Sequence, residues 1–252
     1  MENQNIRKKR KLLILRIALM LSIIAMITFA ALLAWEFYTR QAGQSFYDEV
    51  AVGFKPSLNQ EAPDQEPFVD FDALREIMPD IVGWLQSYGT PINYPIVQGR
   101  DNDFYLRHLP DKSRNKLGSI FLDYRNAADF SDQNILIYGH NTDTGDIFGS
   151  FKNYRNQQYF EAHSSMFIFT PSADYELILF AGYLLDSAHE VPPMKFDDEA
   201  QFEQFISNIK RRSVFKSDTD VNFSDQIVFL CTCTTGGSRN ERLIIVGKLA
   251  EI

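Results

Sequence analysis

The chain has 252 residues, of which 45% are hydrophobic and 23% are charged. This balance excludes an intrinsically disordered chain and predicts a globular domain with a large core, to which 21 Phe and 11 Tyr residues contribute. The net charge of the chain is −8. Residues 36–252 are more acidic than this value suggests, because six of the basic residues lie within the first 35 positions. An acidic surface repels phosphate, so we expect no nucleic-acid partner, although solubility alone explains this charge equally well.

The N-terminal segment differs in kind from the rest of the chain. A basic run at residues 7–11 precedes residues 17–35, a stretch of 19 uncharged residues, close to the roughly 20 that span a bilayer as a helix. The positive-inside rule predicts a cytoplasmic segment at 1–16, a single-pass transmembrane anchor at 17–35, and an extracellular remainder. A cleaved signal peptide also fits the small residues near position 30, but its apolar core is shorter, at about 7–15 residues.

Residues 36–69 are polar and contain several glycines and prolines, which indicates a stalk or linker, with a short helix around 44–51. The globular domain is expected at 70–252 and has a mainly β pattern. We expect strands at 81–85, 92–97, 118–124, 134–138, 167–170, 175–185, 226–233 and 242–249. A helix should run from Asp70 or Asp72 to residue 78, and another over 197–212. Eight short strands with few helices predict a closed or nearly closed barrel.

The only two cysteines, Cys231 and Cys233, are separated by one residue. A disulfide between them would close a small, strained ring, and a disulfide-dependent secreted domain of this size would have more cysteines. Two cysteines and four scattered histidines lack the spacing of zinc ligands. We therefore expect neither a disulfide framework nor a metal, and nothing in the sequence calls for an organic cofactor.

Three residues at expected strand ends could form a nucleophilic site. Cys233 ends an apolar strand before a Gly/Thr loop, where a thiol gains the partial exposure that reactivity needs. His140 follows the strand 134–138 and could act as general acid or base. Arg242 opens the last strand and, in an antiparallel hairpin with 226–233, would lie near Cys233 and stabilise an oxyanion.

Each of these residues also has an ordinary interpretation. Cys233 fits a buried structural thiol, His140 a hydrogen-bonded loop histidine, and Arg242 a solvated strand end. Arg239, in the loop between the last two strands, is the rival for the arginine role.

The same residues lie in motifs that resemble the sortase family. Leu-Cys-Thr-Cys at 230–233 is similar to the sortase signature Leu-x-Thr-Cys, an arginine follows nine residues after the last cysteine, and the histidine stands in Tyr-Gly-His-Asn. Segments 82–84, 92–98 and 118–124 resemble class B sortases in order and spacing. Class B is also indicated by the helical segment before the first strand and by the long insertion around 187–215.

The resemblance covers roughly residues 70–250 and has one departure. Phe229 stands where the family often has threonine, and Cys231 takes the variable position, which is often small and polar. The nucleophile assignment is unaffected, but a second thiol lies two residues away on the same strand face. The resemblance implies an eight-stranded sortase-type β-barrel with an N-terminal helical segment and a helix inserted before the cysteine strand.

The resemblance also implies an activity, that of a cysteine transpeptidase. Cys233 would cleave a C-terminal sorting signal of a secreted protein after threonine through a thioester acyl-enzyme. His140 would transfer protons, and Arg242 would stabilise the oxyanion. A peptidoglycan-precursor amine would accept the protein, with water as the slow default.

By the same resemblance, the sorting signal would contact Asn102, Leu106 and Thr232. A helix cap and a core leucine are equally good interpretations of the first two. Three other functions remain open from the sequence: a pilin-polymerising sortase, a cell-wall cysteine peptidase or amidase, and a non-catalytic surface binding module.

Overall fold

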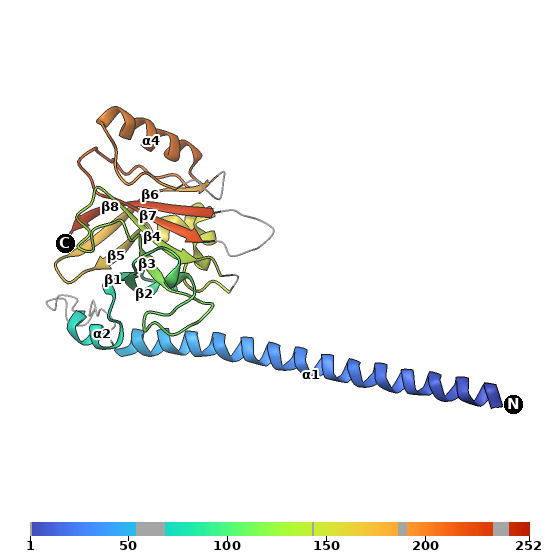
Figure 1. The fold of residues 1–252 in the computed structure, drawn as a ribbon. Helices are drawn as coiled ribbons and strands as arrows, with labels where there is room; N and C mark the ends of the chain where they lie inside the picture. Colours follow the sequence, from blue (N-terminus) through green and yellow to red (C-terminus); the bar gives the residue numbers. More distant parts are fainter. Residues whose placement is uncertain (1, 54–68, 143, 186–190, 234–241) are drawn as a thin grey trace. The chain divides into compact units, whose positions relative to one another are not determined.

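The structure, a computed structural model, describes residues 2–53, 69–142, 144–185, 191–233 and 242–252. It divides into two compact units, Met1–Ser45 and Phe46–Ile252. The first unit consists of most of helix α1 (Glu2–Gly53) (Figure 1). Large apolar side chains between Leu12 and Tyr38 are exposed, and the most apolar stretch of the helix has a mean hydropathy of 2.6. The helix is therefore long and apolar enough to cross a membrane, which is compatible with an anchor.

The second unit begins with the last turns of α1. Tyr47 and Val50 are each only 5% exposed, and Val50 packs in one cluster with Leu74 and Met78. This compact unit thus starts at Phe46, before the boundary expected at residue 70. The reason is that Tyr47 and Val50, three residues apart and therefore on one face of the helix, are buried within it. Residues 54–68 of the segment 36–69 lie outside the described residues. The assignments of anchor and stalk stay predictions.

Eight strands form the closed barrel that the sequence predicts (Figure 1). They are β1 (Ile81–Gln86), β2 (Asn93–Gln98), β3 (Ile120–Leu122), β4 (Asn134–His140), β5 (Ser165–Phe169), β6 (Asp174–Leu185), β7 (Ile227–Cys233) and β8 (Arg242–Glu251). Around the barrel their order is β1-β2-β3-β4-β7-β8-β6-β5. The pairs β2–β3 and β4–β7 are parallel, and the other neighbours are antiparallel.

Short helices connect and cover the strands. They are α2 (Phe71–Ile77), η1 (Phe104–Leu106), η2 (Gly149–Arg155), α3 (Gln157–Ala162) and α4 (Glu199–Arg212). Asp70 caps α2 by accepting a hydrogen bond from the Ala73 amide, and Asp198 caps α4 in the same way through Gln201. The α2 and α4 helices confirm the sequence analysis. The segment η2 was not predicted, because no amphipathic period marks so short a turn.

Alternation along the strands separates apolar side chains inside the barrel from those outside it. The barrel interior is filled from all eight strands, for example by Ile137 of β4, Leu230 of β7 and Ile245 of β8. The outer face of β2, β3, β4, β6, β7 and β8 carries a second core, which packs beneath α4, whereas Trp84 of β1 and Phe169 of β5 pack in the cluster with Leu74. Tyr138, Cys231, Ile244 and Phe229 belong to this second, outer core. We call the strands β4, β7 and β8 the barrel wall. Successive residues of each of these strands point alternately into the barrel and outward.

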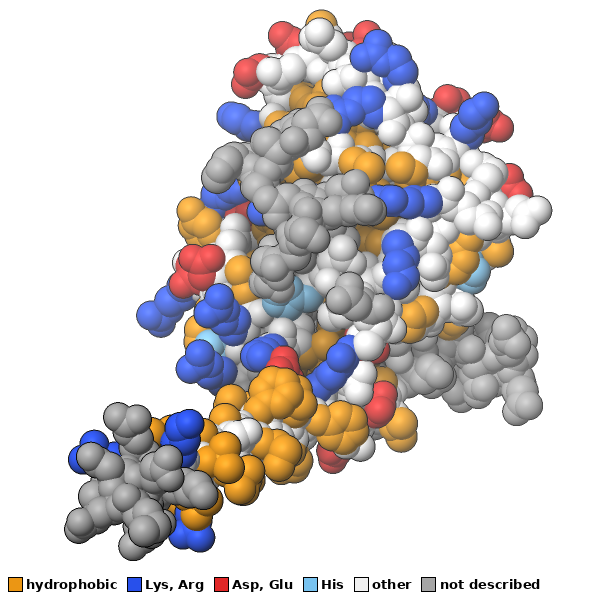
Figure 2. All heavy atoms as spheres, turned by 90° about the vertical axis from the view of Figure 1, so that its right-hand side faces the viewer, with side chains coloured by type: hydrophobic (Ala, Val, Ile, Leu, Met, Phe, Trp, Pro, Cys, Tyr) orange, Lys and Arg blue, Asp and Glu red, His pale blue; other side chains and the backbone are white. Residues whose placement is uncertain are grey.

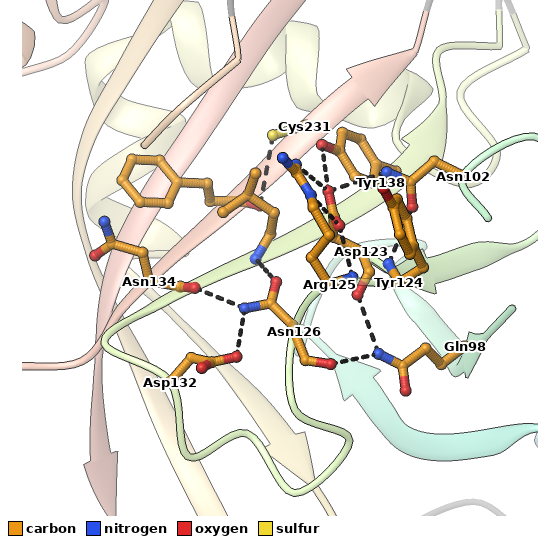
Figure 3. Close-up of polar contacts among 12 residues, drawn as sticks. Gln98, Asn102, Asp123, Tyr124, Arg125, Asn126, Asp132, Asn134, Tyr138 and Cys231 are labelled. Carbon is orange, nitrogen blue, oxygen red and sulfur yellow. Dashed lines mark hydrogen bonds and ion pairs between the residues drawn. The ribbon is translucent and has the colours of Figure 1, made fainter. Parts of the chain in front are cut away.

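A buried carboxylate joins β3, β4 and the chain before η1. Asp123 is fully buried, and Figure 3 shows it at the centre of a polar network. Its carboxylate accepts hydrogen bonds from Arg125 Nε at 2.9 Å and Nη2 at 2.7 Å, from the Tyr138 hydroxyl at 3.0 Å, and from Asn102 Nδ2 at 3.0 Å. Burial alone would raise the pKa of Asp123, but the hydrogen bonds from Arg125 and Asn102 outweigh it and lower that pKa.

We expect Asp123→Asn to lower the free energy of unfolding by about 1–3 kcal/mol at pH 7, because the hydrogen bonds of Arg125, Tyr138 and Asn102 would lose their buried anionic acceptor. A folded-state pKa below the unfolded value stabilises the protein above the unfolded pKa, and this gain disappears as pH falls through the folded pKa. The difference between variant and wild type should therefore shrink below about pH 4. Urea unfolding at neutral and acid pH measures it, with exposed Asp103→Asn as the control. An equal loss at both pH values would contradict this account.

Candidate active site

The three predicted catalytic residues lie at the ends of three adjacent strands. The parallel pairing of β4 and β7 places His140 level with Cys233. The antiparallel pairing of β7 and β8 runs as far as Cys231 opposite Ile244. Cys233 lies two residues after the last paired position of β7, and Arg242 lies two residues before that of β8. The hairpin expected between the last two strands is confirmed, and it brings Arg242 to the same end of the barrel wall.

Period-two alternation places the three positions on one face of the wall. Tyr138, Cys231 and Ile244 all belong to the outer core. Positions 140 and 233 lie two residues after Tyr138 and Cys231, and position 242 lies two residues before Ile244, so all three positions are on the same face. The side chain of Cys233 and residues 234–241, which include Arg239, lie outside the described residues.

Thr232 maintains this register up to the strand ends. Its side chain is 2% exposed. Its hydroxyl donates to the Leu243 carbonyl and accepts from the Leu243 amide, both at 2.9 Å. One side chain thus satisfies both main-chain groups of the facing residue where the ladder of β7 and β8 ends. A contact between Thr232 and the sorting signal stays a prediction.

His140 is buried and oriented by main-chain groups. Its side chain is 5% exposed, and Nε2 lies 2.5 Å from the Leu106 carbonyl oxygen. A carbonyl oxygen can only accept, so Nε2 carries the proton in this contact. In the neutral ring, Nδ1 is then the nitrogen that can take up a proton, which fits a residue that exchanges protons with a thiol or an amine.

Gly118 provides the space in which the His140 ring lies. A Cβ atom at this position would be 2.8 Å from His140 Cδ2 and 2.8 Å from the Leu106 carbonyl oxygen. The backbone of Gly118 also has φ of +65°, a conformation that other residues rarely adopt. Gly118 was not recognised from the sequence as a neighbour of His140, because it was expected to be the first residue of the strand 118–124.

The guanidinium of Arg242 includes a buried donor. Its backbone pairs with Leu185 of β6, and its side chain is half-buried. Within the described part of the chain, Nε is buried and has no hydrogen-bond partner. An unpaired buried donor costs about 1–3 kcal/mol, which an oxygen atom of a bound ligand would recover. Arg242 is thus suited to bind a carbonyl oxygen or an oxyanion.

The remaining predicted residues, Asn102 and Leu106, lie beside this wall. Asn102 donates to Asp123 and accepts from the Tyr124 amide at 3.1 Å (Figure 3). Leu106 ends η1, packs its half-buried side chain against the outer core, and orients His140 through its carbonyl. Their contacts with a sorting signal stay predictions. Asp123, which fixes Asn102, was missed because a single aspartate in an apolar run gives no sign of its partners.

Figure 2 shows the side of the molecule toward which β7 runs in Figure 1. Basic and apolar side chains of the second unit lie around the segments drawn in grey, and acidic side chains are less prominent there. The acidic excess of the chain, with its net charge of −8, is therefore not concentrated on this face.

Among the described residues, no group of three or more His, Cys, Asp or Glu side chains is arranged to hold a metal ion. The arrangement described above brings together a thiol position, an imidazole and a guanidinium. These groups suit nucleophilic acyl transfer.

Comparison with known proteins agrees with this arrangement. The sortase domain family matches residues 87–250. Sortase B of Listeria monocytogenes is 32% identical over 215 residues, which cover 85% of this chain and 87% of that protein. Sortase B of Staphylococcus aureus is 28% identical over 247 residues, which cover 98% of this chain and 99% of that protein.

Solved structures give the same result. The structure of a Staphylococcus aureus sortase B–substrate complex superposes with a TM-score of 0.76 at 28% identity, covering 84% of this chain and 98% of that one. Sortase B from Bacillus anthracis in complex with AAEK1 has a TM-score of 0.73 at 31% identity, covering 86% and 100%. The chain therefore belongs to the sortase family of transpeptidases, and within it to class B.

Proposed function

We propose that this sortase uses Cys233 to cleave a C-terminal sorting signal after threonine and transfers the secreted protein to a peptidoglycan-precursor amine. The observation that carries the proposal is the level pairing of His140 with Cys233 across β4 and β7. The buried Nε of Arg242 on the next strand, which has no hydrogen-bond partner among the described residues, supports it.

The proposed reaction has two acyl-transfer steps. His140 takes the proton of the Cys233 thiol, and the thiolate attacks the threonine carbonyl carbon. Arg242 donates hydrogen bonds to the developing oxyanion. His140 then protonates the departing amine, and a thioester remains on Cys233. An incoming amine loses its proton to His140 and attacks the thioester, which forms a new amide and regenerates the thiol.

The acceptor is proposed to be a primary amine. A solved structure of sortase B complexed with triglycine resembles this chain at 27% identity with a TM-score of 0.70. Triglycine ends in a primary amine, the nucleophile that the second step requires. In the alternative reactions the acceptor differs. Hydrolysis would use water, and pilin polymerisation would use a lysine amine of another protein. No described residue favours either of these over the peptidoglycan-precursor amine.

The proposed location follows from α1. Its exposed apolar side chains would lie in the membrane over residues 17–35, with residues 1–16 in the cytoplasm and the second unit outside the cell. This arrangement would present the site to secreted proteins and to lipid-linked wall precursors at the same membrane surface.

We expect Cys233→Ala to abolish acyl-enzyme formation and Cys231→Ser to retain most activity. Cys231 is 4% exposed and lies in the outer core, so substrate cannot reach its thiol. The experiment incubates the full chain with peptides that span the C-termini of secreted proteins from the same genome, with and without triglycine. Mass spectrometry then identifies the modified cysteine and the transfer product. An adduct on Cys231, or cleavage by Cys233→Ala, would refute the assignment.

We expect Arg242→Lys to lower kcat by about 10²–10³, the usual loss on removal of one preorganised oxyanion donor. Lysine keeps the charge but lacks the planar set of donors. Arg239→Ala is the matched control and should change kcat little. Steady-state kinetics on one cleaved peptide measure both variants. Near-normal turnover by Arg242→Lys, or a larger defect in Arg239→Ala, would show that the other arginine acts.

A further inference from the structure

We propose that Tyr47, in the last turns of α1, is a positioning residue for the imidazole of His140. The inference rests on the role proposed above for His140 and extends it to a residue outside the region 87–250 that the sortase family matches. Tyr47 belongs to the same compact unit as the barrel. It connects to His140 by two separate routes.

The first route passes through Gly118. The Tyr47 hydroxyl donates a hydrogen bond of 2.6 Å to the Gly118 carbonyl oxygen. Gly118 lies directly against the His140 ring, since a Cβ there would be 2.8 Å from Cδ2. It is equally close to the Leu106 carbonyl oxygen that accepts from Nε2. The Tyr47 hydroxyl therefore fixes the backbone that borders both the ring and its hydrogen-bond partner.

The second route passes through Tyr94 of β2. The Tyr47 ring packs edge-on against Tyr94, with 5.1 Å between centroids and 87° between planes. The Tyr94 hydroxyl oxygen accepts a hydrogen bond of 3.2 Å from the Ile147 amide. Ile147 forms a β-bridge with Asn141, the residue after His140. Tyr47 thus also supports the segment that leaves His140 at the end of β4.

These contacts are buried, so water cannot easily replace them. Tyr47 is 5% exposed, Tyr94 8% and His140 5%. Removal of the Tyr47 hydroxyl would leave the Gly118 carbonyl without its hydrogen bond from this side chain, at a site closed to solvent. The backbone there is free to shift toward another donor, and the ring beside it would lose its single orientation. The described contacts connect Tyr47 to His140 through Gly118 and Tyr94, so its proposed effect on His140 is indirect.

The test uses the tautomer of His140 as its readout. The full chain is labelled with ¹⁵N-histidine in detergent micelles, and long-range ¹H–¹⁵N spectra are recorded at a pH where the ring is neutral. His140→Gln identifies the signal among the four histidines of the chain. In the wild type we expect the Nε2–H tautomer, held by the Leu106 carbonyl. In Tyr47→Phe we expect the ratio of the two tautomers to shift toward Nδ1–H by up to about fivefold, the effect of one ordinary hydrogen bond.

Tyr38→Phe is the matched control, because Tyr38 lies on the same helix and is 67% exposed. It should leave the tautomer ratio at the wild-type value. Thermal unfolding checks that each variant is folded. If Tyr47→Phe does not fold, Tyr94→Phe tests the second route, since it removes the acceptor of the Ile147 amide.

An unchanged ratio in a folded Tyr47→Phe or, where that variant does not fold, in a folded Tyr94→Phe would overturn the proposal. A wild-type ring without the Nε2–H tautomer would overturn it as well. The measurement requires no turnover, so it stands even if the acyl-enzyme experiment fails. Conversely, a normal acyl-enzyme with an unchanged tautomer ratio would refute only the role of Tyr47.

Discussion

The parallel pairing of β4 with β7 is the constraint on which the site depends. These strands lie far apart in the sequence, yet their register places His140 level with Cys233. A shift by one residue would move either position to the other face of the barrel wall. The apolar side chains of two cores prevent such a shift, because each strand buries one set inside the barrel and another beneath α4. The energy that fixes the register of the two proposed catalytic residues is thus mainly that of packing.

Hydrogen bonds fix the site in addition to the packing of the two cores. The hydroxyl of Thr232 binds both main-chain groups of Leu243 and so joins β7 and β8 one residue beyond their last paired positions, next to the proposed nucleophile Cys233. These two hydrogen bonds give the threonine at this position of Leu-x-Thr-Cys a structural role in this chain. On the other side, the Leu106 carbonyl and Gly118 orient the His140 ring. Contacts between β7 and β8 therefore fix one part of the site, and residues in and after η1 fix the His140 ring.

The sequence predicted the strands, the barrel and the positions of the three proposed catalytic residues, because these depend on local alternation and on motifs with distinctive spacing. It did not predict what supports those residues. Tyr47 lies in a segment that resembles a polar stalk, and its contact with Gly118 spans 71 residues. Asp123 looks like an interruption of an apolar run, while its partners come from positions 102, 125 and 138. Such contacts arise from tertiary packing, which no single segment encodes.

The central claim is that His140 and Cys233 act as one unit because their strands pair level. The most direct test is the rate of Cys233 alkylation by iodoacetamide as a function of pH, in the full chain and in His140→Gln, with peptide mapping to exclude Cys231. A thiol that exchanges its proton with a neighbouring imidazole should show a different pH profile once that imidazole is removed. We therefore predict distinct profiles for the two proteins. Superimposable profiles, with both proteins folded, would contradict the account.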